Sequence, residues 1–408
     1  MTAATSPSVV RDDVPAYDVD IYSDAVIRDP YPHYSRIREL GAAVWLPANG
    51  MWAIGRHADV RACLSDHDTF RSGMGVAGND RANGIAPGNL LASDPPLHEE
   101  LRRIVAAPLS LRALNDVKDR ITETADALVE RLVERGSFDG MADLAQYLPV
   151  SIVSELVGMP EHGRENMLRW ASAVFDMLGG ANERAEAAFP VIKEMRAYTV
   201  NEATRDNVRP GGWVAMLYDA ADQGLIRPEQ VQMLMRDYLG PSLDTTIYAT
   251  GHLLYLLGAN PGQWERLVQE PKLVPNAINE AVRLESPIRG FTRTVAVDTV
   301  VGDVAIPAGD RVLILYASAN RDERQWDRPE AFDVGRVLID HVGFGHGIHA
   351  CAGMQLARLE MRCILTAMVE RVARIEVGEP VLAMNNVLRG YERLPVRFLK
   401  KGGDPAVG

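Results

Sequence analysis

The sequence has few cysteines and no long apolar run. Only three of its 408 residues are cysteine (Cys63, Cys351 and Cys363), which is too small and odd a set for a disulfide framework and favours a reducing compartment. The longest apolar stretch, around residues 252–259, is far shorter than the roughly 20 residues that a membrane-spanning helix needs. The first 20 residues lack a basic start followed by an apolar run, so we expect a cytoplasmic protein without a secretory signal.

The sequence also has fewer basic than acidic residues. The chain has 43 basic and 55 acidic residues, a net charge of −12, which argues against nucleic acid or an anionic membrane as the main partner. Repeats, low-complexity tracts and Gly/Ser-rich linkers are absent from the sequence. With 47% hydrophobic residues, such a chain can bury a large core. We therefore expect one domain over residues 1–408.

The spacing of the apolar residues is mainly helical. Strand-like patterns are confined to two short runs that flank Asn49-Gly50, to residues 292–316 and to short runs near the C-terminus, whereas the glycine-rich residues 72–91 predict a long loop. The fold class that follows is mainly α with a small β region. The predicted helices cover residues 32–40, 115–135, 143–158, 164–178, 185–206, 228–258, 263–285 and about 351–372.

The strongest local signal is the sequence FGHGIHACAG at residues 344–353, which directly precedes a predicted helix. Its glycines let the backbone approach a flat, bulky group closely. A cysteine at a helix entry faces the positive end of the helix dipole and free N–H groups, and both stabilise a thiolate. No second cysteine lies nearby, which disfavours a zinc or iron–sulfur site, whereas haem needs only one axial thiolate. The competing interpretation is a buried structural cysteine after a glycine turn.

This segment resembles the cysteine loop of the cytochrome P450 family, because it completes the signature Phe-Gly-x-Gly-x-His-x-Cys-x-Gly. The resemblance covers roughly residues 20–400 and implies the P450 fold, a triangular-prism helical domain with minor β sheets. It also implies haem b (iron protoporphyrin IX) as cofactor, with Cys351 as the axial metal ligand. Cys63 and Cys363 lie outside any such context and are interpreted as structural.

The resemblance assigns four further residues to the cofactor. His98, Arg102, Arg293 and His349 match positions that bind the haem propionates in the family. His98 and Arg102 are four residues apart in a predicted helix and so share one face. Two buried carboxylates require cationic and hydrogen-bonding partners of this kind.

Three charged residues match a structural element of the family. Glu280 and Arg283 are three residues apart and match its Glu-x-x-Arg pair. The resemblance implies that this pair locks with Arg336, in the segment that leads to the cysteine loop. Taken alone, such a pair is more often part of a solvated helix face.

A proline interrupts the predicted helix 228–258 just before an acid–alcohol pair. Pro241 removes one backbone N–H, and threonines can bond back to carbonyls one turn earlier, so we expect a locally opened helix with a polar groove. A simple proline kink is the alternative. The family pattern here is Ala-Gly-x-Asp/Glu-Thr-Thr, and this chain keeps Asp244 and Thr245 but has Pro241 and Ser242 in place of Ala and Gly. The implied catalytic roles are hydrogen bonding to oxygen by Thr245 and proton supply by Asp244.

The reaction that the resemblance implies is insertion of one oxygen atom from O2 into a small-molecule substrate. Electrons come from a separate ferredoxin and reductase, because the chain contains no flavin or ferredoxin module. A peroxide-driven peroxygenase and a non-catalytic haem- or ligand-binding member are the alternatives, and the retained Asp244 and Thr245 count against both. Four arginines form either a ferredoxin-docking patch or ordinary solvated helix faces, and they are Arg103, Arg112, Arg358 and Arg362.

The substrate residues expected from the family alignment are apolar, which favours a small, neutral or mostly apolar substrate, preferably aromatic, and hydroxylation or O-demethylation. Some stretches are similar to bacterial members that demethylate methoxybenzoates, which hold the carboxylate with an Arg and a Ser. This chain has Ile85 and Gly88 there, which disfavours a benzoate unless Arg81 or Arg289 points inward. The expected pocket residues are Leu91, Phe175, Leu178, Leu239, Leu243, Ile288, Phe291 and Val387.

Overall fold

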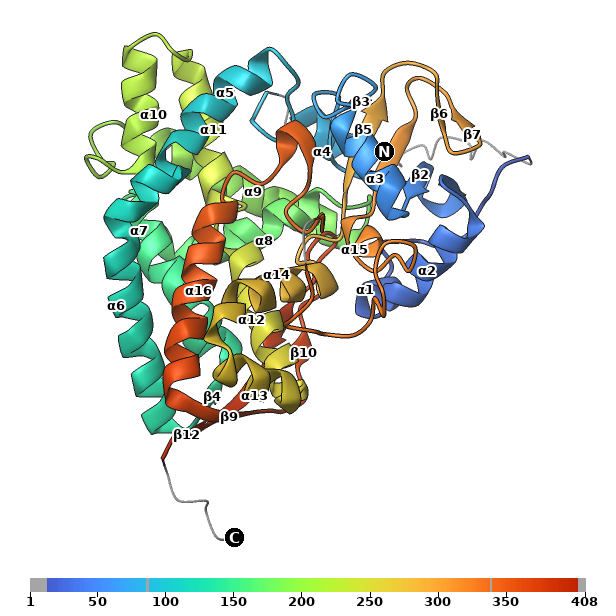
Figure 1. Ribbon diagram of the computed structural model, residues 1–408. Coiled ribbons are helices and arrows are strands. Elements are labelled where there is room, and N and C mark those ends of the chain that lie inside the picture. Colours follow the sequence, from blue (N-terminus) through green and yellow to red (C-terminus); the bar gives the residue numbers. More distant parts are fainter. Residues whose placement is uncertain (1–12, 86–87, 338–339, 403–408) are drawn as a thin grey trace.

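Helices make up most of the computed structural model, which describes residues 13–85, 88–337 and 340–402 (Figure 1). The fold class expected from the sequence, mainly α with small sheets, is confirmed. The helices are α1 (Asp24–Arg28), α2 (Tyr31–Leu40), α3 (His57–Ser65), α4 (Asp80–Ile85), α5 (Leu97–Ala106), α6 (Leu111–Arg135), α7 (Ser154–Val157), α8 (Met167–Met177), α9 (Glu183–Asn201), α10 (Trp213–Asp222), α11 (Pro228–Leu239), α12 (Asp244–Ala259), α13 (Pro261–Gln269), α14 (Val274–Leu284), α15 (Tyr316–Ala319) and α16 (Met354–Arg371).

The strands form one five-stranded sheet and three small ones. The largest has the order β1-β2-β8-β5-β3, in which β2 and β8 are parallel and the other pairs antiparallel. It lies beside α1 and α2 on one side of the molecule, away from the long helices (Figure 1). The strands are β1 (Val44–Leu46), β2 (Met51–Ile54), β3 (Phe70–Arg71), β4 (Ser137–Asp139), β5 (Phe291–Val295), β6 (Thr299–Val301), β7 (Val304–Ile306), β8 (Arg311–Ile314), β9 (Val372–Val377), β10 (Val381–Leu382), β11 (Tyr391–Arg393) and β12 (Pro395–Lys400).

The helical core forms where α6 and α16 run side by side and α12 packs against α14 (Figure 1). Helix α6 shows why the sequence folds this way. Ser110 caps its first turn, Gly136 ends it at φ 77°, and its buried residues recur at helical spacing along one face. No helix in the described part of the chain is long and apolar enough to cross a membrane.

Several predicted boundaries are wrong, for identifiable reasons. The single helix expected over 228–258 is two helices, because residues 240–243 around Pro241 leave the helical path. The helix expected over 263–285 is also divided, by a turn that starts at Pro271. The loop expected over 72–91 contains α4, and residues 143–158 contain two π-helical turns and the short helix α7 rather than one regular helix.

Candidate active site

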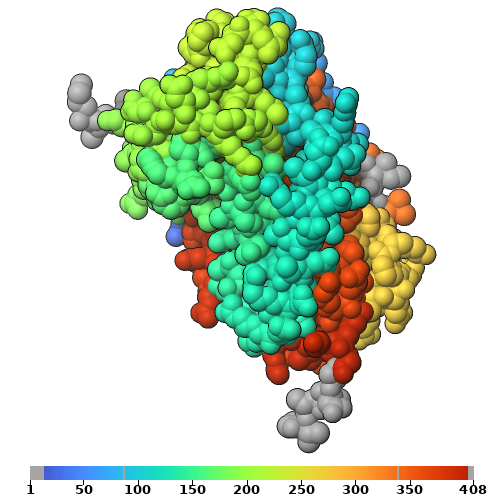
Figure 2. Space-filling view, turned by 90° about the vertical axis from the view of Figure 1, so that its left-hand side faces the viewer, coloured from blue at the N-terminus to red at the C-terminus, as the bar shows by residue number. Residues whose placement is uncertain are grey.

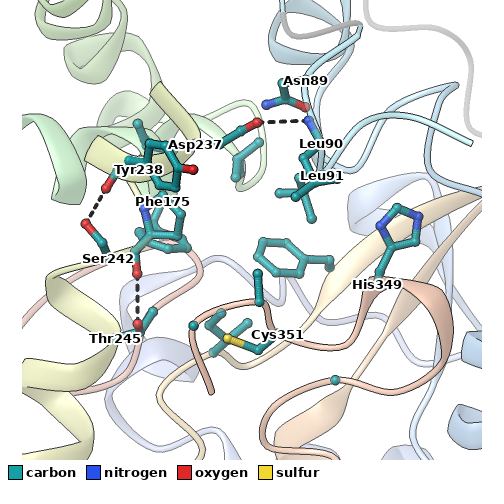
Figure 3. A pocket seen from close by; sticks show the side chains of 18 of the residues that line it. Asn89, Leu90, Leu91, Phe175, Asp237, Tyr238, Ser242, Thr245, His349 and Cys351 are labelled. Atoms are coloured by element: carbon teal, nitrogen blue, oxygen red, sulfur yellow. Dashed lines mark hydrogen bonds between the residues drawn. The ribbon is translucent and has the colours of Figure 1, made fainter. Parts of the chain in front are cut away.

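Cys351 lies at the end of a tight turn, directly before α16. Gly345 and Gly347 adopt φ values of 71° and 70°, a region that side chains disfavour, and a Cβ on Gly347 would lie 2.2 Å from the carbonyl oxygen of Leu64. The Cys351 N–H donates to the carbonyl oxygen of Phe344 at 2.8 Å. The turn therefore fixes the cysteine backbone, and the side chain lines an internal cavity (Figure 3).

Opposing effects act on the Cys351 thiol. Enclosure by the protein raises its pKa, whereas N–H groups of Gly353 and Met354 and the nearby Arg102 and Arg358 lower it. These donors and cations stabilise a thiolate, the form that coordinates a metal ion. Among the described residues no group of three or more His, Cys, Asp and Glu side chains is arranged to hold a metal ion. Cys351 thus suits a cofactor that takes a single thiolate from the protein.

The cavity has a volume of about 540 Å³ and lies between the α11–α12 region and residues 89–92 (Figure 3). Cys351 and Thr245 both line it. Most of its remaining wall is apolar. The expected substrate residues that line it are Leu91, Phe175, Leu178, Ile288 and Phe291.

Three of the expected substrate residues do not line this cavity. Leu239 and Leu243 flank the break between α11 and α12, and Val387 precedes β11. All three are almost completely buried in the hydrophobic core instead. The prediction that these residues line the pocket is therefore wrong: Leu239 and Leu243 pack into the core at the break, and Val387 packs there from the chain before β11.

The residues expected near the haem propionates gather at this cavity. Arg102, Arg293 and His349 line it, and the ring of His98 lies 4.2 Å from that of His349, centroid to centroid. Both ring nitrogens of His98 and Nε2 of His349 are buried without a hydrogen-bond partner in the described part of the chain. Burial and the neighbouring cations lower the pKa of His349 to about 2, so its ring is neutral.

Unsatisfied buried ring nitrogens are costly, and they indicate a polar partner that the protein chain does not supply. Arg102 donates to the carbonyl oxygen of Ala350 at 2.6 Å, which leaves further guanidinium donors. A flat group with two carboxylates beside a single thiolate meets these requirements. The residues present therefore fit haem, with Cys351 as its iron ligand and the four basic residues around its propionates.

The acid–alcohol pair sits at the helix break. Ser242 donates its hydroxyl to the carbonyl oxygen of Tyr238, and Thr245 donates to that of Pro241 at 3.0 Å (Figure 3). These side chains satisfy carbonyls that a continuous helix would have paired with backbone N–H groups. Asp244 starts α12, is 5% exposed and does not line the cavity, and its Oδ2 has no hydrogen-bond partner among the described residues.

Comparison with known proteins decides the family. A sequence model of the family named Cytochrome P450 matches residues 181–373. Cytochrome p450 CYP199A2 of Rhodopseudomonas palustris is 36% identical over 403 residues, which cover 98% of each chain. Cytochrome P450 107B1 of Saccharopolyspora erythraea is 31% identical and covers 93% of this chain and 98% of its own.

The chain belongs to the cytochrome P450 family. The crystal structure of CalO2 covers 94% of this P450 with a TM-score of 0.81 at 27% identity, and all of the CalO2 chain is covered. The myxobacterial cytochrome P450 CYP267B1, solved in complex with myristic acid, covers 93% with a TM-score of 0.81 at 28% identity, and 98% of its own chain is covered. This protein is therefore a haem b monooxygenase that uses O2, a small-molecule substrate and redox partners.

The Glu-x-x-Arg pair of this P450 is completely buried. Arg283 donates to both carboxylate oxygens of Glu280, at 2.7 and 2.8 Å, and Arg336 donates to Oε1 at 2.9 Å. Arg283 also donates to the carbonyl oxygens of Asn320 and Pro329. The three side chains join α14 to the segment that leads to the cysteine loop, so they hold structure and do not touch the cavity.

The sequence did not decide whether Arg81 or Arg289 points into the pocket, and in the structure neither lines the cavity. Arg81 is exposed and pairs with Glu186, while the buried Arg289 donates to the carbonyl oxygens of Asn385 and Asn386. Instead, two arginines that the sequence patterns did not single out line the cavity, Arg196 of α9 and Arg236 of α11. In the sequence, the feature that could have indicated these residues is the charged pair Arg236-Asp237 near the end of a mainly apolar helical segment.

The Arg196 and Arg236 side chains have no hydrogen bond or ion pair within residues 13–85, 88–337 and 340–402. Burial, followed by the charge of Arg196, lowers the pKa of Arg236 to about 10. Asp237 lies beside Arg236 and accepts a hydrogen bond from the Leu90 N–H at 2.9 Å (Figure 3). Burial raises the pKa of Asp237 to about 7. Two cations and one weak acid therefore line this cavity in addition to the basic residues that gather near Cys351.

Proposed function

We propose that this P450 hydroxylates or O-demethylates a small substrate with an apolar, aromatic body, in the cytoplasm, as one haem domain over residues 1–408. The observation that supports this proposal is that Cys351 and Thr245 line one cavity whose wall is mostly apolar. Haem b, when bound through Cys351, supplies the reductive activation of O2. Phe175 and Phe291 bind and orient the aromatic body and exclude water.

Asp244 and Thr245 take up and pass on the protons that the reaction consumes. The Thr245 hydroxyl already donates to the carbonyl oxygen of Pro241, so its lone pairs are free to accept a proton. Asp244 precedes it, and burial raises the pKa of its carboxyl to about 7, which suits a group that takes up and releases protons at neutral pH. A peroxygenase or a non-catalytic member needs no such pair. Turnover that depends on O2 and reduced ferredoxin separates these alternatives.

The substrate also carries an anionic group in this proposal, unlike the neutral molecule favoured by the sequence. Arg196 and Arg236 are unpaired at the cavity, and Arg236 is partly buried, where a cation gains most from an anionic partner. With Asp237 ionised, the three charges sum to one positive charge, which matches a monocarboxylate. The neighbour CYP267B1 was solved with myristic acid, a carboxylate with an apolar body.

The test is a spectroscopic titration of the ferric, haem-loaded protein with matched ligand pairs. The pairs are 4-methoxybenzoate with its methyl ester, and decanoate with decanol. We expect each carboxylate to bind about tenfold more tightly than its neutral partner, which corresponds to about 1.4 kcal/mol. The Arg236→Met variant should abolish this preference, with Arg81→Met as the matched control. Equal affinity within both pairs would contradict the anionic substrate, and preference for the decanoate pair would contradict the aromatic one.

The proposed electron donor is a ferredoxin that docks over α6 and α16. Figure 2 shows these helices side by side on one face of the molecule, with the segment of α13 and α14 beyond them. A small groove of about 160 Å³ lies between them and is lined by Lys118, Arg358 and Arg362. Arg103 and Arg112 are also exposed. On a chain of net charge −12, these basic side chains suit an acidic partner.

Charge reversal tests the docking face. The Arg112→Glu/Arg362→Glu variant should raise the KM for ferredoxin about tenfold and weaken its salt dependence, because rim charges mainly steer encounter. The control is Arg36→Glu on α2, whose exposed side chain pairs with Glu39 away from this face. An unchanged KM would place the docking surface elsewhere.

A further inference from the structure

Arg358 of α16 is a half-buried cation that is held by an amide instead of a carboxylate. Its Nε and Nη2 atoms both donate to Oδ1 of Asn279, at 3.1 and 2.7 Å, and it forms no ion pair within the part of the chain that the structure describes. The Asn279 Nδ2 donates to the carbonyl oxygen of Pro275 at 2.9 Å, which leaves Oδ1 to accept from Arg358. Asn279 belongs to α14, which packs against α16. These bonds fix the guanidinium in one place.

The fixed guanidinium lies over the first residue of the cysteine loop. Its Cζ is 4.8 Å from the centroid of the Phe344 ring, which is within the range of a cation–π contact. The His341 ring lies 5.8 Å from the same ring, centroid to centroid. Burial, followed by the charges of Arg358 and Arg283, lowers the pKa of His341 to about 4, so His341 is neutral at pH 7. Arg358 therefore supplies the positive charge at the Phe344 ring.

Phe344 connects this cation to the site. It lines the same cavity as Cys351, and its carbonyl oxygen accepts from the Cys351 N–H at 2.8 Å. Arg358 and Asn279 do not line that cavity but line the groove of about 160 Å³ described above. Arg358 thus stands between the groove and the cysteine loop, and its charge reaches Cys351 through the protein and not through the cavity.

A positive charge in this place favours the reduced form of the cofactor. With haem b bound through Cys351, reduction from ferric to ferrous adds one negative charge beside the thiolate, and a fixed cation stabilises that added charge. Screening by salt is weak because the guanidinium is half-buried. The electron comes from the redox partner, and no bond forms or breaks in this step.

We propose that Arg358, held against Phe344 by Asn279, is a positioning residue that raises the reduction potential of the haem and weakens electron donation by the Cys351 sulfur. This role differs from partner docking and does not depend on the substrate. Arg362, one turn further along α16, lines the same groove and is exposed. It makes no hydrogen bond to Asn279 and no cation–π contact with Phe344 among the described residues, so it serves as the matched comparison.

The first test is a redox titration of the haem-loaded protein without any redox partner. Arg358→Met should shift the ferric–ferrous equilibrium about tenfold towards the ferric form, which lowers the potential by about 59 mV for a one-electron couple. Arg362→Met removes the same charge from the same helix and groove, and it should change the equilibrium by less than about twofold because its side chain is exposed. Haem content and the reduced carbon monoxide spectrum check that each variant is folded.

The second test asks whether Asn279 acts through Arg358. Asn279→Ala keeps the charge but frees the guanidinium, so we expect a shift of about threefold in the same direction. Combined with Arg358→Met, it should add nothing further, because the side chain that it holds is already absent.

The third test reads the sulfur by infrared spectroscopy of the reduced carbon monoxide complex. Without the cation the sulfur donates more strongly, and a more electron-rich iron passes more density to carbon monoxide. The C–O stretching frequency should therefore fall in Arg358→Met and stay at the wild-type value in Arg362→Met.

Three results would overturn the proposal. An unchanged potential in Arg358→Met would mean that its charge does not act on the cofactor. Equal shifts in Arg358→Met and Arg362→Met would mean that the general charge of the groove acts, without any need for the contact with Phe344. Additive shifts from Asn279→Ala and Arg358→Met would mean that Asn279 does not position Arg358.

Discussion

At the scale of single residues, Cys351 and the charged groups around the cavity carry the chemistry. The thiol is enclosed, yet two backbone N–H groups and two arginines favour its anionic form. The same cavity brings together neutral His349, unpaired Arg236 and the weak acid Asp237. Each of these groups has a different task because its surroundings differ.

Replacing the sulfur should remove the spectroscopic signature of the site. In Cys351→Ala we expect the strongly red-shifted Soret band of the reduced carbon monoxide complex to disappear, because the anionic sulfur ligand is lost. Absorbance spectra of wild type and variant, normalised to bound haem, provide the measurement. Cys63→Ala, at a buried cysteine outside the cavity wall, is the control and should keep the band. A band retained in Cys351→Ala would contradict the assignment of this ligand.

Binding of an anionic ligand should depend on pH through Asp237. Burial raises the pKa of this carboxyl to about 7, so it is neutral below that pH and negative above it. The added negative charge opposes a carboxylate ligand, and we expect the Kd of 4-methoxybenzoate to rise about threefold to tenfold as the pH increases from about 6 to about 8. Asp237→Asn should flatten this profile while its side-chain oxygen still accepts from Leu90 N–H. A pH profile that is unchanged in the variant would refute this role.

At the scale of elements, the break between α11 and α12 shapes the site. Pro241 has no backbone N–H to donate. The hydroxyls of Ser242 and Thr245 donate to carbonyl oxygens that would otherwise have no hydrogen-bond donor. The break lets Thr245 line the cavity while Asp244 stays buried at the start of α12. A straight helix would have carried Leu239 and Leu243 along a different face.

Helix α12 is also held closely by the chain before β11. A Cβ on Gly390 would lie 2.1 Å from the Tyr248 ring, a contact that requires the ring to move. We expect Gly390→Ala to lower the free energy of unfolding by about 1–3 kcal/mol, as for other overpacked sites. Denaturant unfolding of the haem-loaded protein measures this change.

The matched control is a glycine with open space. A Cβ on Gly262 in α13 would have no neighbouring heavy atom within 4 Å, so Gly262→Ala should be neutral or stabilise by up to about 1 kcal/mol. Equal effects of the two substitutions would mean that packing against Tyr248 is not the cause.

At the scale of the whole molecule, the buried charges of Glu280, Arg283 and Arg336 join the helical part to the segment that carries the cysteine loop. Glu280 and Arg283 have no exposed side-chain surface. Breaking a buried pair leaves an uncompensated charge, which is far more costly than the net gain from the pair.

Arg283→Met should therefore lower the free energy of unfolding by about 3–5 kcal/mol and reduce haem retention. Denaturant unfolding and the haem content of purified protein measure both effects. Arg36→Met, which removes an exposed ion pair with Glu39, should change stability by less than about 1 kcal/mol. Similar losses in the two variants would contradict the structural role of the buried cluster.

Local patterns predicted much of this protein. The cysteine loop was recognisable because tight turns need glycine and a helix entry favours a thiolate, and both are properties of neighbouring residues. Helix α6 was predicted over residues 115–135 because its apolar spacing and its terminal glycine lie within one segment, but its first turn after the Ser110 cap was missed. A local opening at Pro241 was expected, but the full division there and the turn at Pro271 were missed because the patterns on either side of each proline are both helical.

By itself, the sequence determined the family and the mainly helical class, and it predicted the Cys351 ligand and the acid–alcohol pair, because these depend on residue type and short spacing. Only the tertiary structure decided which side chains meet at the cavity. It placed Leu239, Leu243 and Val387 in the core, and it brought Arg196 of α9 and Arg236 of α11 to the wall of one cavity. Such contacts join residues from separate helices, so their burial and charge follow from packing and cannot be derived from local sequence.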